Sequence, residues 1–349
     1  MIVLKICVVG LGNIGLQLLM DLNRRKIPAA GVDVKLEVVE SLRLEGYQVA
    51  TDIRDFQDTD AWLVAISTGA KMESLFELIE HLHPKPGALI SIESTLIPGT
   101  MQRLAEVFEK QQYQIGHDLF FVHVPHRINF GMDRDVFEQP RVIGGITEAC
   151  LNRGCQFYQP LIKKMIPLHD VRLAELAKVI ENSIRHLNIA FAETIYQYCI
   201  AQELDFQELR KAVNSKSNVT LLDVDYGIGG ECLTKDMQFL EDLTETPLMR
   251  SALQADHEYR EFLFQMLKNE SGVLISGVTY KPELKNTGFS RAIELYWKLA
   301  DHGTPVYAED PYLTGTELQQ LGLRPWNNEP VSVIIKRGKI FPHFSGVLI

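Results

Sequence analysis

A glycine-rich turn near the start of the chain is the feature that most constrains its fold. Residues 2–9 form an apolar run with valine and isoleucine, and the sequence GLGNIG follows it directly and opens a helical pattern. Such a run is typical of a buried parallel strand. In a strand–turn–helix unit of this kind, Gly10 allows the tight turn. Gly12 lets a pyrophosphate approach the backbone, and Gly15 lets the helix pack on the strand.

This turn predicts a dinucleotide site, because the amides and dipole of a helix N-terminus attract phosphate. Asp33 lies 18 residues after Gly15, at the end of the expected second strand. An acid there would bind the ribose 2′-hydroxyl and favour NAD over NADP. Flavins bind the same fold, and a glycine-rich turn without a ligand is the structural alternative. The expected NAD-binding residues are Gly10, Gly12, Asn13, Ile14, Gly15 and Asp33.

Apolar and helical patterns alternate along the chain, which predicts an α/β protein with a parallel sheet. Strands are expected at 31–34, 62–66, 89–92 and 120–124, and a long helix from Leu173 to about Gln202. A second strand–helix–strand set follows at 273–278, 292–299 and 305–308, with one more strand at 332–336. We expect a Rossmann-like, doubly wound NAD-binding domain (1–170), a central long-helix region (171–264) and a smaller C-terminal α/β domain (265–349).

Composition excludes several classes of protein. The net charge of -10 argues against nucleic acid as a main partner. No apolar run approaches the roughly 20 residues that span a bilayer, and no signal peptide is evident. The five cysteines show no metal-ligand spacing, so we expect no metal, reduced thiols and a cytoplasmic location.

A second glycine-rich segment, GIGGECLTKD at residues 227–236, contains a candidate nucleophile. Glycines let the backbone approach a ligand, and a cysteine beside a cation can ionise and attack a carbonyl carbon. Hydride removal from an alcohol yields an aldehyde, which a thiolate can trap. Cys232 is therefore consistent with the dinucleotide turn. It could instead be a small core residue, but the glycines before it make a poor core strand.

With both segments read, the chain resembles the nucleotide-sugar 6-dehydrogenases, which act on UDP-glucose, GDP-mannose or UDP-N-acetylmannosamine. The resemblance runs from residue 3 to about 312, with several motifs in the family's order. These motifs are GLGNIG (10–15), ESTLIPGT (93–100), VPHR (124–127), PRVIGG (140–145), AELAKVIENSIRHLNIAFAE (174–193), GIGGECLTKD (227–236), GVTYKP (277–282) and EDPY (309–312). Segments 124–127 and 181–193 look closer to the UDP-N-acetylmannosamine type.

The resemblance implies a four-electron oxidation of a sugar C6 alcohol to a carboxylate, with two NAD, for polysaccharide biosynthesis. Spacing of four places Lys178 and Asn182 on one helix face. Read without the family, Lys178 could be a solvated lysine and Asp236 a helix cap. The residues that the resemblance implies are Cys232 as nucleophile, Lys178 and Asn182 at the reacting oxygen, Asp236 holding the water or the lysine, Thr95 near the nicotinamide, and Arg127, Arg185, Asn188 and Lys281 at the substrate.

The chain departs from the family at three places. His126 stands where the family has a glutamate, the expected base for thioester hydrolysis. Histidine can also act as a base, so His126 is kept as a catalytic candidate. Gly288 stands where the family has a phosphate-binding arginine, with Arg291 three residues on. The chain ends about 37 residues after Tyr312, so we expect a shortened C-terminal domain.

Three hypotheses of function follow. The first is an NAD-dependent nucleotide-sugar 6-dehydrogenase that forms a homodimer through the long central helix, as similar enzymes do. The second is a simple two-electron dehydrogenase in which Cys232 is idle. The third is a non-catalytic protein that binds NAD or a nucleotide sugar.

Overall fold

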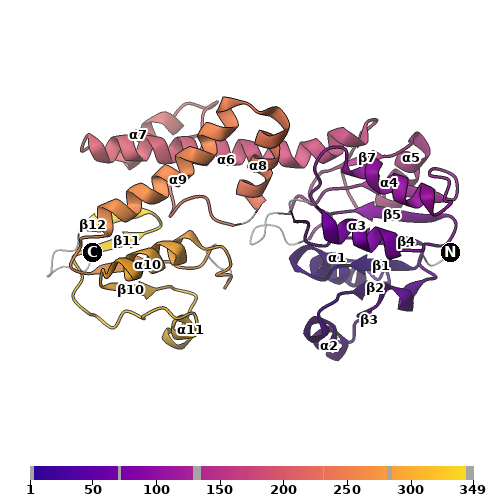
Figure 1. The fold of residues 1–349 in the computed structure, drawn as a ribbon, viewed down its shortest axis with the longest axis horizontal. Helices are drawn as coiled ribbons and strands as arrows, with labels where there is room; N and C mark the ends of the chain where they lie inside the picture. Colours follow the sequence, from indigo (N-terminus) through magenta and orange to yellow (C-terminus); the bar gives the residue numbers. More distant parts are fainter. Residues whose placement is uncertain (1–3, 70–71, 129–134, 231, 281–284, 343–349) are drawn as a thin grey trace. The chain divides into compact units, whose positions relative to one another are not determined.

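The computed structural model describes residues 4–69, 72–128, 135–230, 232–280 and 285–342 (Figure 1). These residues belong to two compact units, 1–179 and 180–349. The boundary falls within helix α6 (Val171–Ala201), which has 31 residues and matches the long helix predicted from the sequence. A separate domain over 171–264 stays a prediction.

The first unit is built on one sheet, with eight strands in its described residues. Their order is β3-β2-β1-β4-β5-β6-β7-β8, and neighbours run parallel except β6 and β7. Because β1 lies between β2 and β4, the sheet is doubly wound. The strands are β1 (Ile6–Val9), β2 (Ala29–Val32), β3 (Val49–Ala50), β4 (Ala61–Val64), β5 (Ala88–Ile92), β6 (Leu119–His123), β7 (Arg141–Gly145) and β8 (Met165–Leu168).

Helices cover both faces of this sheet, because its central strands are apolar on both sides. Val8 of β1 packs in one core with Leu18 of α1, whereas the adjacent Cys7 is buried on the opposite face. On that opposite face, the rings of Phe121 and Phe108 lie 5.5 Å apart and join β6 to α4. The helices of this unit before α6 are α1 (Asn13–Arg24), α2 (Leu36–Leu44), a 3-10 turn (Ile53–Phe56), α3 (Glu73–His81), α4 (Thr100–Lys110) and α5 (Glu148–Tyr158).

The turn between β1 and α1 closes on two of its glycines. Gly10 has a φ of 86°, a conformation that favours glycine. A Cβ on Gly15 would lie 1.7 Å from the carbonyl oxygen of Gly10, so α1 approaches the turn very closely. A Cβ on Gly12 would meet no described atom within 4 Å. The turn is therefore tight at Gly10 and Gly15 and open at Gly12.

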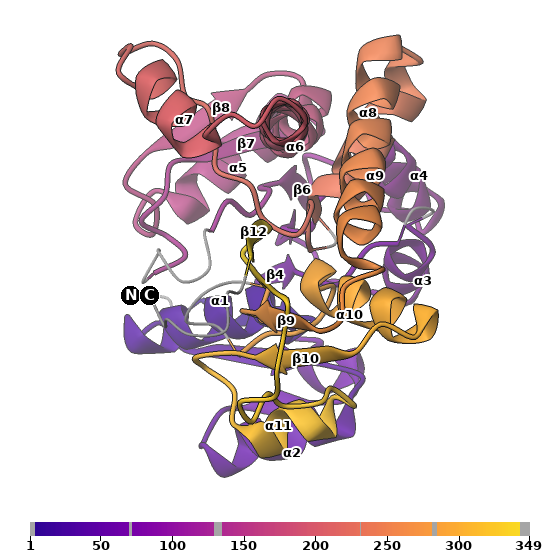
Figure 2. The same ribbon diagram turned by 90° about the vertical axis from the view of Figure 1, so that its left-hand side faces the viewer.

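The second unit contains a smaller sheet, with four strands in the part of it that the structure describes. Their order is β10-β9-β11-β12; β9 runs parallel to β10 and β11, and β12 is antiparallel to β11. Helix α9 packs against α8 and α10 (Figure 2). The elements are α7 (Phe206–Asn214), α8 (Cys232–Thr244), α9 (Pro247–Leu267), β9 (Val273–Ser276), α10 (Arg291–His302), β10 (Val306–Glu309), α11 (Gly315–Gln320), β11 (Val333–Lys336) and β12 (Lys339–Pro342).

The predicted fold class is confirmed, with differences in detail. The strand expected at 31–34 lies two residues earlier, as β2, and β7 runs antiparallel to β6. Strand β12 was not predicted. It forms because Arg337 and Gly338 both have positive φ angles, which a two-residue hairpin turn requires. No helix within the described ranges is long and apolar enough to cross a membrane.

The glycine turn generates a prediction with a matched control. Gly15→Ala should destabilise the ligand-free protein by about 1–3 kcal/mol, because the new methyl group overlaps the Gly10 carbonyl. Gly12→Ala should cost less than about 1 kcal/mol, because its methyl group meets open space. Chemical denaturation of both variants measures the difference. Equal losses of stability would contradict the close approach of α1.

Candidate active site

In the first unit, several predicted cofactor residues and the catalytic candidate His126 follow the carboxyl ends of parallel strands. Gly10 and Gly12 follow β1, and Asp33 follows β2. Thr95 follows β5, and His126 follows β6. These four strands run parallel in one sheet, so their carboxyl ends meet at one edge. Open α/β sheets bind their ligands at that edge.

The turn fits the pyrophosphate of a dinucleotide. Helix α1 begins at Asn13, and no described side chain caps its first amides or places an acid in its first turn. Uncapped amides and the helix dipole attract phosphate oxygens. The open space at Gly12 allows a close approach to the backbone. Asn13, Ile14 and Gly15 form the first turn of α1, so these residues suit the phosphates of NAD.

Asp33 holds the turn as well as standing at the predicted ribose position. Its Oδ2 accepts a hydrogen bond from the Leu11 amide at 2.7 Å, and its Oδ1 accepts one from the Lys35 amide at 2.9 Å. Each carboxylate oxygen has two lone-pair sites. Asp33 can therefore fix the turn and still accept a ribose hydroxyl, and contact with the ribose stays a prediction.

A buried ion pair that the sequence analysis did not assign supports the segment containing His126. The side chains of Glu93 and Arg141 form the pair and are both fully buried. Arg141 also donates to the carbonyl oxygen of Val124, and the His126 amide donates to the carbonyl oxygen of Glu93 at 3.1 Å. The signal in the sequence is a charged residue directly beside an apolar strand, which in a core requires a partner.

His126 is buried and neutral. Burial lowers its pKa well below the usual value, and the positive charges of Arg141 and Lys178 lower it further. Its Nδ1 accepts a hydrogen bond from the Ile128 amide at 3.4 Å, so the neutral ring carries its proton on Nε2. That Nε2 has no hydrogen-bond partner among the described residues. His126 can therefore donate a hydrogen bond, but it lacks the negative charge of the family's glutamate.

In the second unit, the structure brings three of the predicted catalytic residues together. Cys232 is the first residue of α8, and it alone is exposed among the five cysteines, all of which are described. Asp236, one helical turn further, is buried and accepts a hydrogen bond from Nδ2 of Asn182 at 2.5 Å. The Ser183 hydroxyl donates to the backbone carbonyl of Asp236 at 3.4 Å. Helices α6 and α8 are thus joined beside the cysteine.

The predicted substrate ligands lie on several elements. Along α6, Arg185 follows the half-buried Lys178 at a spacing of seven residues, which places both on one face. Arg185 and Asn188 are exposed. Arg127 is half-buried and donates to the carbonyl oxygen of Pro140 at 2.9 Å. Lys281 lies outside the described residues.

Arg291, three residues after Gly288, makes its contacts within the protein. Its Nε donates to the carbonyl oxygen of Ile228 at 2.9 Å, and its NH1 pairs with Glu294 at 2.5 Å. Only 17% of its side chain is exposed. Its guanidinium is therefore engaged within the protein.

Comparison with known families identifies the chain. The NAD-binding domain of the UDP-glucose/GDP-mannose dehydrogenase family matches residues 37–162, and the central domain of the same family matches residues 172–257. The chain belongs to the UDP-glucose/GDP-mannose dehydrogenase family. The predictions of the family, of a dehydrogenase and of NAD as its cofactor are confirmed. The central-domain match contains Lys178, Asn182, Cys232 and Asp236, whose individual roles stay predictions.

Several proteins that are similar to this chain have the same name, UDP-N-acetyl-D-mannosamine dehydrogenase. The chain is 26% identical to the UDP-N-acetyl-D-mannosamine dehydrogenase of Campylobacter jejuni, over 95% of this chain and 91% of that protein. It is 28% identical to the enzyme of that name from Methanocaldococcus jannaschii, over 88% of this chain and 79% of that protein. The solved structure of a UDP-D-ManNAc dehydrogenase from Pyrococcus horikoshii has a TM-score of 0.79 and 23% identity, over 89% of this chain and 84% of that one. The structural likeness supports the fold.

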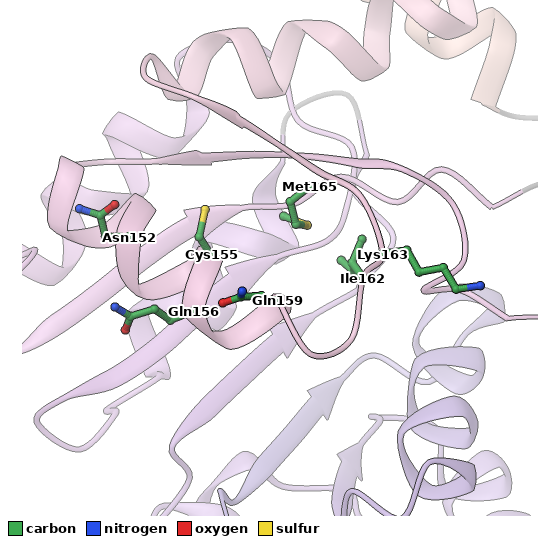
Figure 3. A pocket seen from close by; sticks show the side chains of 7 residues that line it. All are labelled: Asn152, Cys155, Gln156, Gln159, Ile162, Lys163 and Met165. Carbon is green, nitrogen blue, oxygen red and sulfur yellow. The ribbon is translucent and has the colours of Figure 1, made fainter.

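A surface pocket in the first unit contains none of the predicted site residues. Its volume is about 440 Å³, and it lies between α5 and the edge strand β8 (Figure 3). The side chains that line it are Asn152, Cys155, Gln156, Gln159, Ile162, Lys163 and Met165. The candidate residues of each unit, those after the strand ends in the first and those at the α6–α8 contact in the second, therefore lie outside this pocket.

A buried acid in the second unit lies next to the catalytic candidates along the chain. Glu193 of α6 is fully buried, and neither of its carboxyl oxygens has a hydrogen-bond partner in the described ranges. Burial raises its pKa well above the usual value, and the negative charge of Asp256 raises it further. Because burial without a partner penalises the charged form, Glu193 is protonated in the folded protein.

Glu193 should therefore make stability depend on pH. The folded protein holds a proton that the unfolded chain releases above the ordinary glutamate pKa of about 4.3, so this group weakens the fold progressively as pH rises. Glu193→Gln removes the ionisation. Its Tm should exceed the wild-type Tm by a margin that grows between pH 5.5 and pH 8, with about 2–4 °C for each kcal/mol. A margin that is constant with pH would show that Glu193 is ionised.

Proposed function

We propose that this chain oxidises the C6 primary alcohol of a UDP-N-acetylhexosamine, or of a related UDP-hexose, to a uronic acid for polysaccharide biosynthesis. The names of its relatives support a nucleotide sugar of this type. The observation that carries the proposal is the position of Cys232. It is exposed at the start of α8, one turn from Asp236, which is hydrogen-bonded to Asn182.

Cys232 accounts for oxidation beyond the aldehyde. The amides at the start of α8 favour a thiolate there. When bound, NAD accepts the hydride in each oxidation. The thiolate adds to the aldehyde carbon, and the aldehyde oxygen takes a proton. Removal of a second hydride, together with loss of that hydroxyl proton, leaves a thioester. Water then cleaves the carbon–sulfur bond. The alcohol, one water and two NAD give the carboxylate, two NADH and three protons.

Lys178 and Asn182 would stabilise the reacting oxygen. They lie one turn apart on α6, and a cation with an amide donor can balance the charge that develops on an alkoxide or a tetrahedral adduct. One N–H of Asn182 donates to Asp236, which orients the amide and leaves the other N–H for the substrate. Asp236 therefore acts here by positioning Asn182.

His126 would donate a hydrogen bond from Nε2 to the reacting carbonyl or to water. Its neutral ring lacks the charge of an ionised base, and this specific observation favours a second candidate function. If water attacks the thioester too slowly, the protein acts as a two-electron dehydrogenase that stops at the aldehyde level. The two functions differ in stoichiometry, with two NADH for each sugar in the first case and one in the second.

Cys232→Ser tests the proposal. With UDP-N-acetylmannosamine as substrate, the wild type should form two NADH and one uronic acid for each sugar, measured by absorbance and mass spectrometry. Cys232→Ser should lower acid formation by at least about 10⁴-fold, because serine gives no thiolate adduct. Cys155→Ser is the matched control and should behave as the wild type, because Cys155 lines the pocket that contains none of the predicted site residues. Full acid formation by Cys232→Ser would refute the covalent mechanism.

We further propose that α6 pairs with the same helix of a second copy, as the family resemblance implies. A stripe of residues on α6 repeats at alternating spacings of four and three, which is the coiled-coil repeat. Several of its apolar members are exposed in the single chain, including Ile184 (53%) and Phe191 (61%). Exposed apolar stripes of this kind mark protein contacts. The stripe contains Leu173, Ala177, Ile180, Ile184, Leu187, Phe191, Thr194 and Tyr198.

Charges placed in this stripe should separate the dimer. Ile184→Glu combined with Phe191→Glu should weaken association by about a hundredfold or more, because each carboxylate would be buried without a partner. Light scattering coupled to size-exclusion chromatography measures the mass. Lys216→Glu, an exposed change outside α6, controls for added charge. A double variant that keeps the wild-type mass would exclude this helix as the interface.

A further inference from the structure

The loop that leads to Cys232 is held by a closed ring of charged side chains. Four side chains of α9 and α10 take part, namely Asp256, Arg260, Glu294 and Arg291. The ring closes through both polar backbone groups of Ile228, which lies four residues before the cysteine. We call this arrangement the Ile228 clamp. None of its members was singled out as a catalytic candidate.

On the α9 side, the clamp holds the amide of Ile228. Oδ1 of Asp256 accepts the hydrogen bond from this amide at 2.7 Å, and its Oδ2 accepts one from Nε of Arg260 at 3.1 Å. Only 3% of the Asp256 side chain is exposed. A carboxylate buried to this extent requires hydrogen-bond donors for both oxygens. The Ile228 amide and Arg260 are these donors, so they fix the orientation of the Asp256 side chain.

On the α10 side, the clamp holds the carbonyl group of Ile228. Nε of Arg291 donates to this oxygen at 2.9 Å, and its NH1 pairs with Glu294 at 2.5 Å. Glu294 also lies 3.7 Å from NH1 of Arg260, which completes the ring. The clamp thus fixes the direction of one peptide segment from two helices.

The loop needs contacts from α9 and α10 because its own glycines contribute no side chains that could hold it in one conformation. Gly227 and Gly230 have φ angles of 116° and 78°, and glycines lose more conformational freedom than other residues when they are ordered. Beyond the clamp, the Gly230 amide donates to the carbonyl oxygen of Phe289 at 3.2 Å. A Cβ on Gly230 would lie 2.7 Å from the ring of Tyr280, so the loop is also closely covered.

We propose that the Ile228 clamp is a positioning device for Cys232. By fixing the loop at Ile228, it determines where α8 begins and therefore where the thiol lies relative to the helix amides and to Asp236. This inference rests on the proposed role of Cys232 and assigns Asp256 and Arg291 to the reaction as positioning residues. A displacement of about 1 Å at a reacting atom can cost about 100-fold in rate.

Arg291→Met tests the proposal, because methionine keeps an apolar stem but cannot hold the Ile228 carbonyl. The matched control is Glu261→Gln, which breaks the other ion pair between α9 and α10, Lys298–Glu261, without touching the loop. The first readout is the rate of Cys232 alkylation by iodoacetamide in the protein without substrate, followed by peptide mass spectrometry. The second is the separate change in kcat and KM.

Arg291→Met should slow alkylation at pH 7 by about two- to fivefold, the size of a helix-terminus effect on an anion. It should lower kcat by about 10–100-fold, with a smaller change in KM. Arg291→Lys, which keeps one donor, should recover part of both losses, and Glu261→Gln should match the wild type. Asp256→Asn provides an independent variant if Arg291→Met does not fold, with the same expected direction.

Unchanged alkylation in Arg291→Met or Asp256→Asn would overturn the proposal. Equal losses in Glu261→Gln would overturn it too, because they would reflect helix packing in general. Alkylation needs no substrate, so its outcome is separate from that of Cys232→Ser. If Cys232→Ser were fully active while alkylation still depended on Arg291, the thioester mechanism would fail and the clamp would remain.

Discussion

Carboxylates that accept hydrogen bonds from backbone amides hold the functional loops of this protein. Asp33 does this for the turn after β1, and Asp256 for the loop before α8. Glu175 of α6 does the same at the start of α4, where two amides each donate at 2.7 Å. The first two loops are rich in glycine and have few side chains to pack. Charge-assisted hydrogen bonds are stronger than neutral ones, so those of Asp33 and Asp256 decide where these two loops lie. Burial raises the pKa of Glu175 to about 7, so its bonds are charge-assisted only above that pH.

An aspartate that accepts a hydrogen bond from a backbone amide occurs at corresponding places in the two sheets. In the first unit, Gly10 has a φ of 86°, and the adjacent Leu11 amide is held by Asp33 at the end of β2. In the second unit, Gly277 also has a φ of 86°, and Asp310 at the end of β10 holds the Thr279 amide at 2.8 Å. In both units, an aspartate at the end of the second strand therefore stabilises the turn that follows the first strand. The short turn at Gly12 distinguishes the cofactor site, because it places the start of a helix directly beside the strand end.

Much of the fold could be predicted from the sequence, because buried parallel strands are short apolar runs and α6 has an unbroken helical pattern. The antiparallel β7 could not, since strand direction depends on which strand becomes its neighbour. Strand β12 was missed because its hairpin depends on Arg337 adopting a positive φ angle, which that residue type does not favour. The heptad spacing on α6 was visible in the sequence, but its exposure was not.

The candidate site divides in the same way. The sequence by itself determined the glycine turn, a cysteine after a run of glycines and the Lys178–Asn182 spacing, because each is a local pattern of residues. The structure begins α8 at Cys232, so Asp236 lies inside that helix and is not its cap. Only the tertiary structure decided that Arg291 holds the loop before α8, and that His126 is neutral. Hydrogen-bond partners and burial set the charge and the availability of a side chain, and both depend on residues that are distant along the chain.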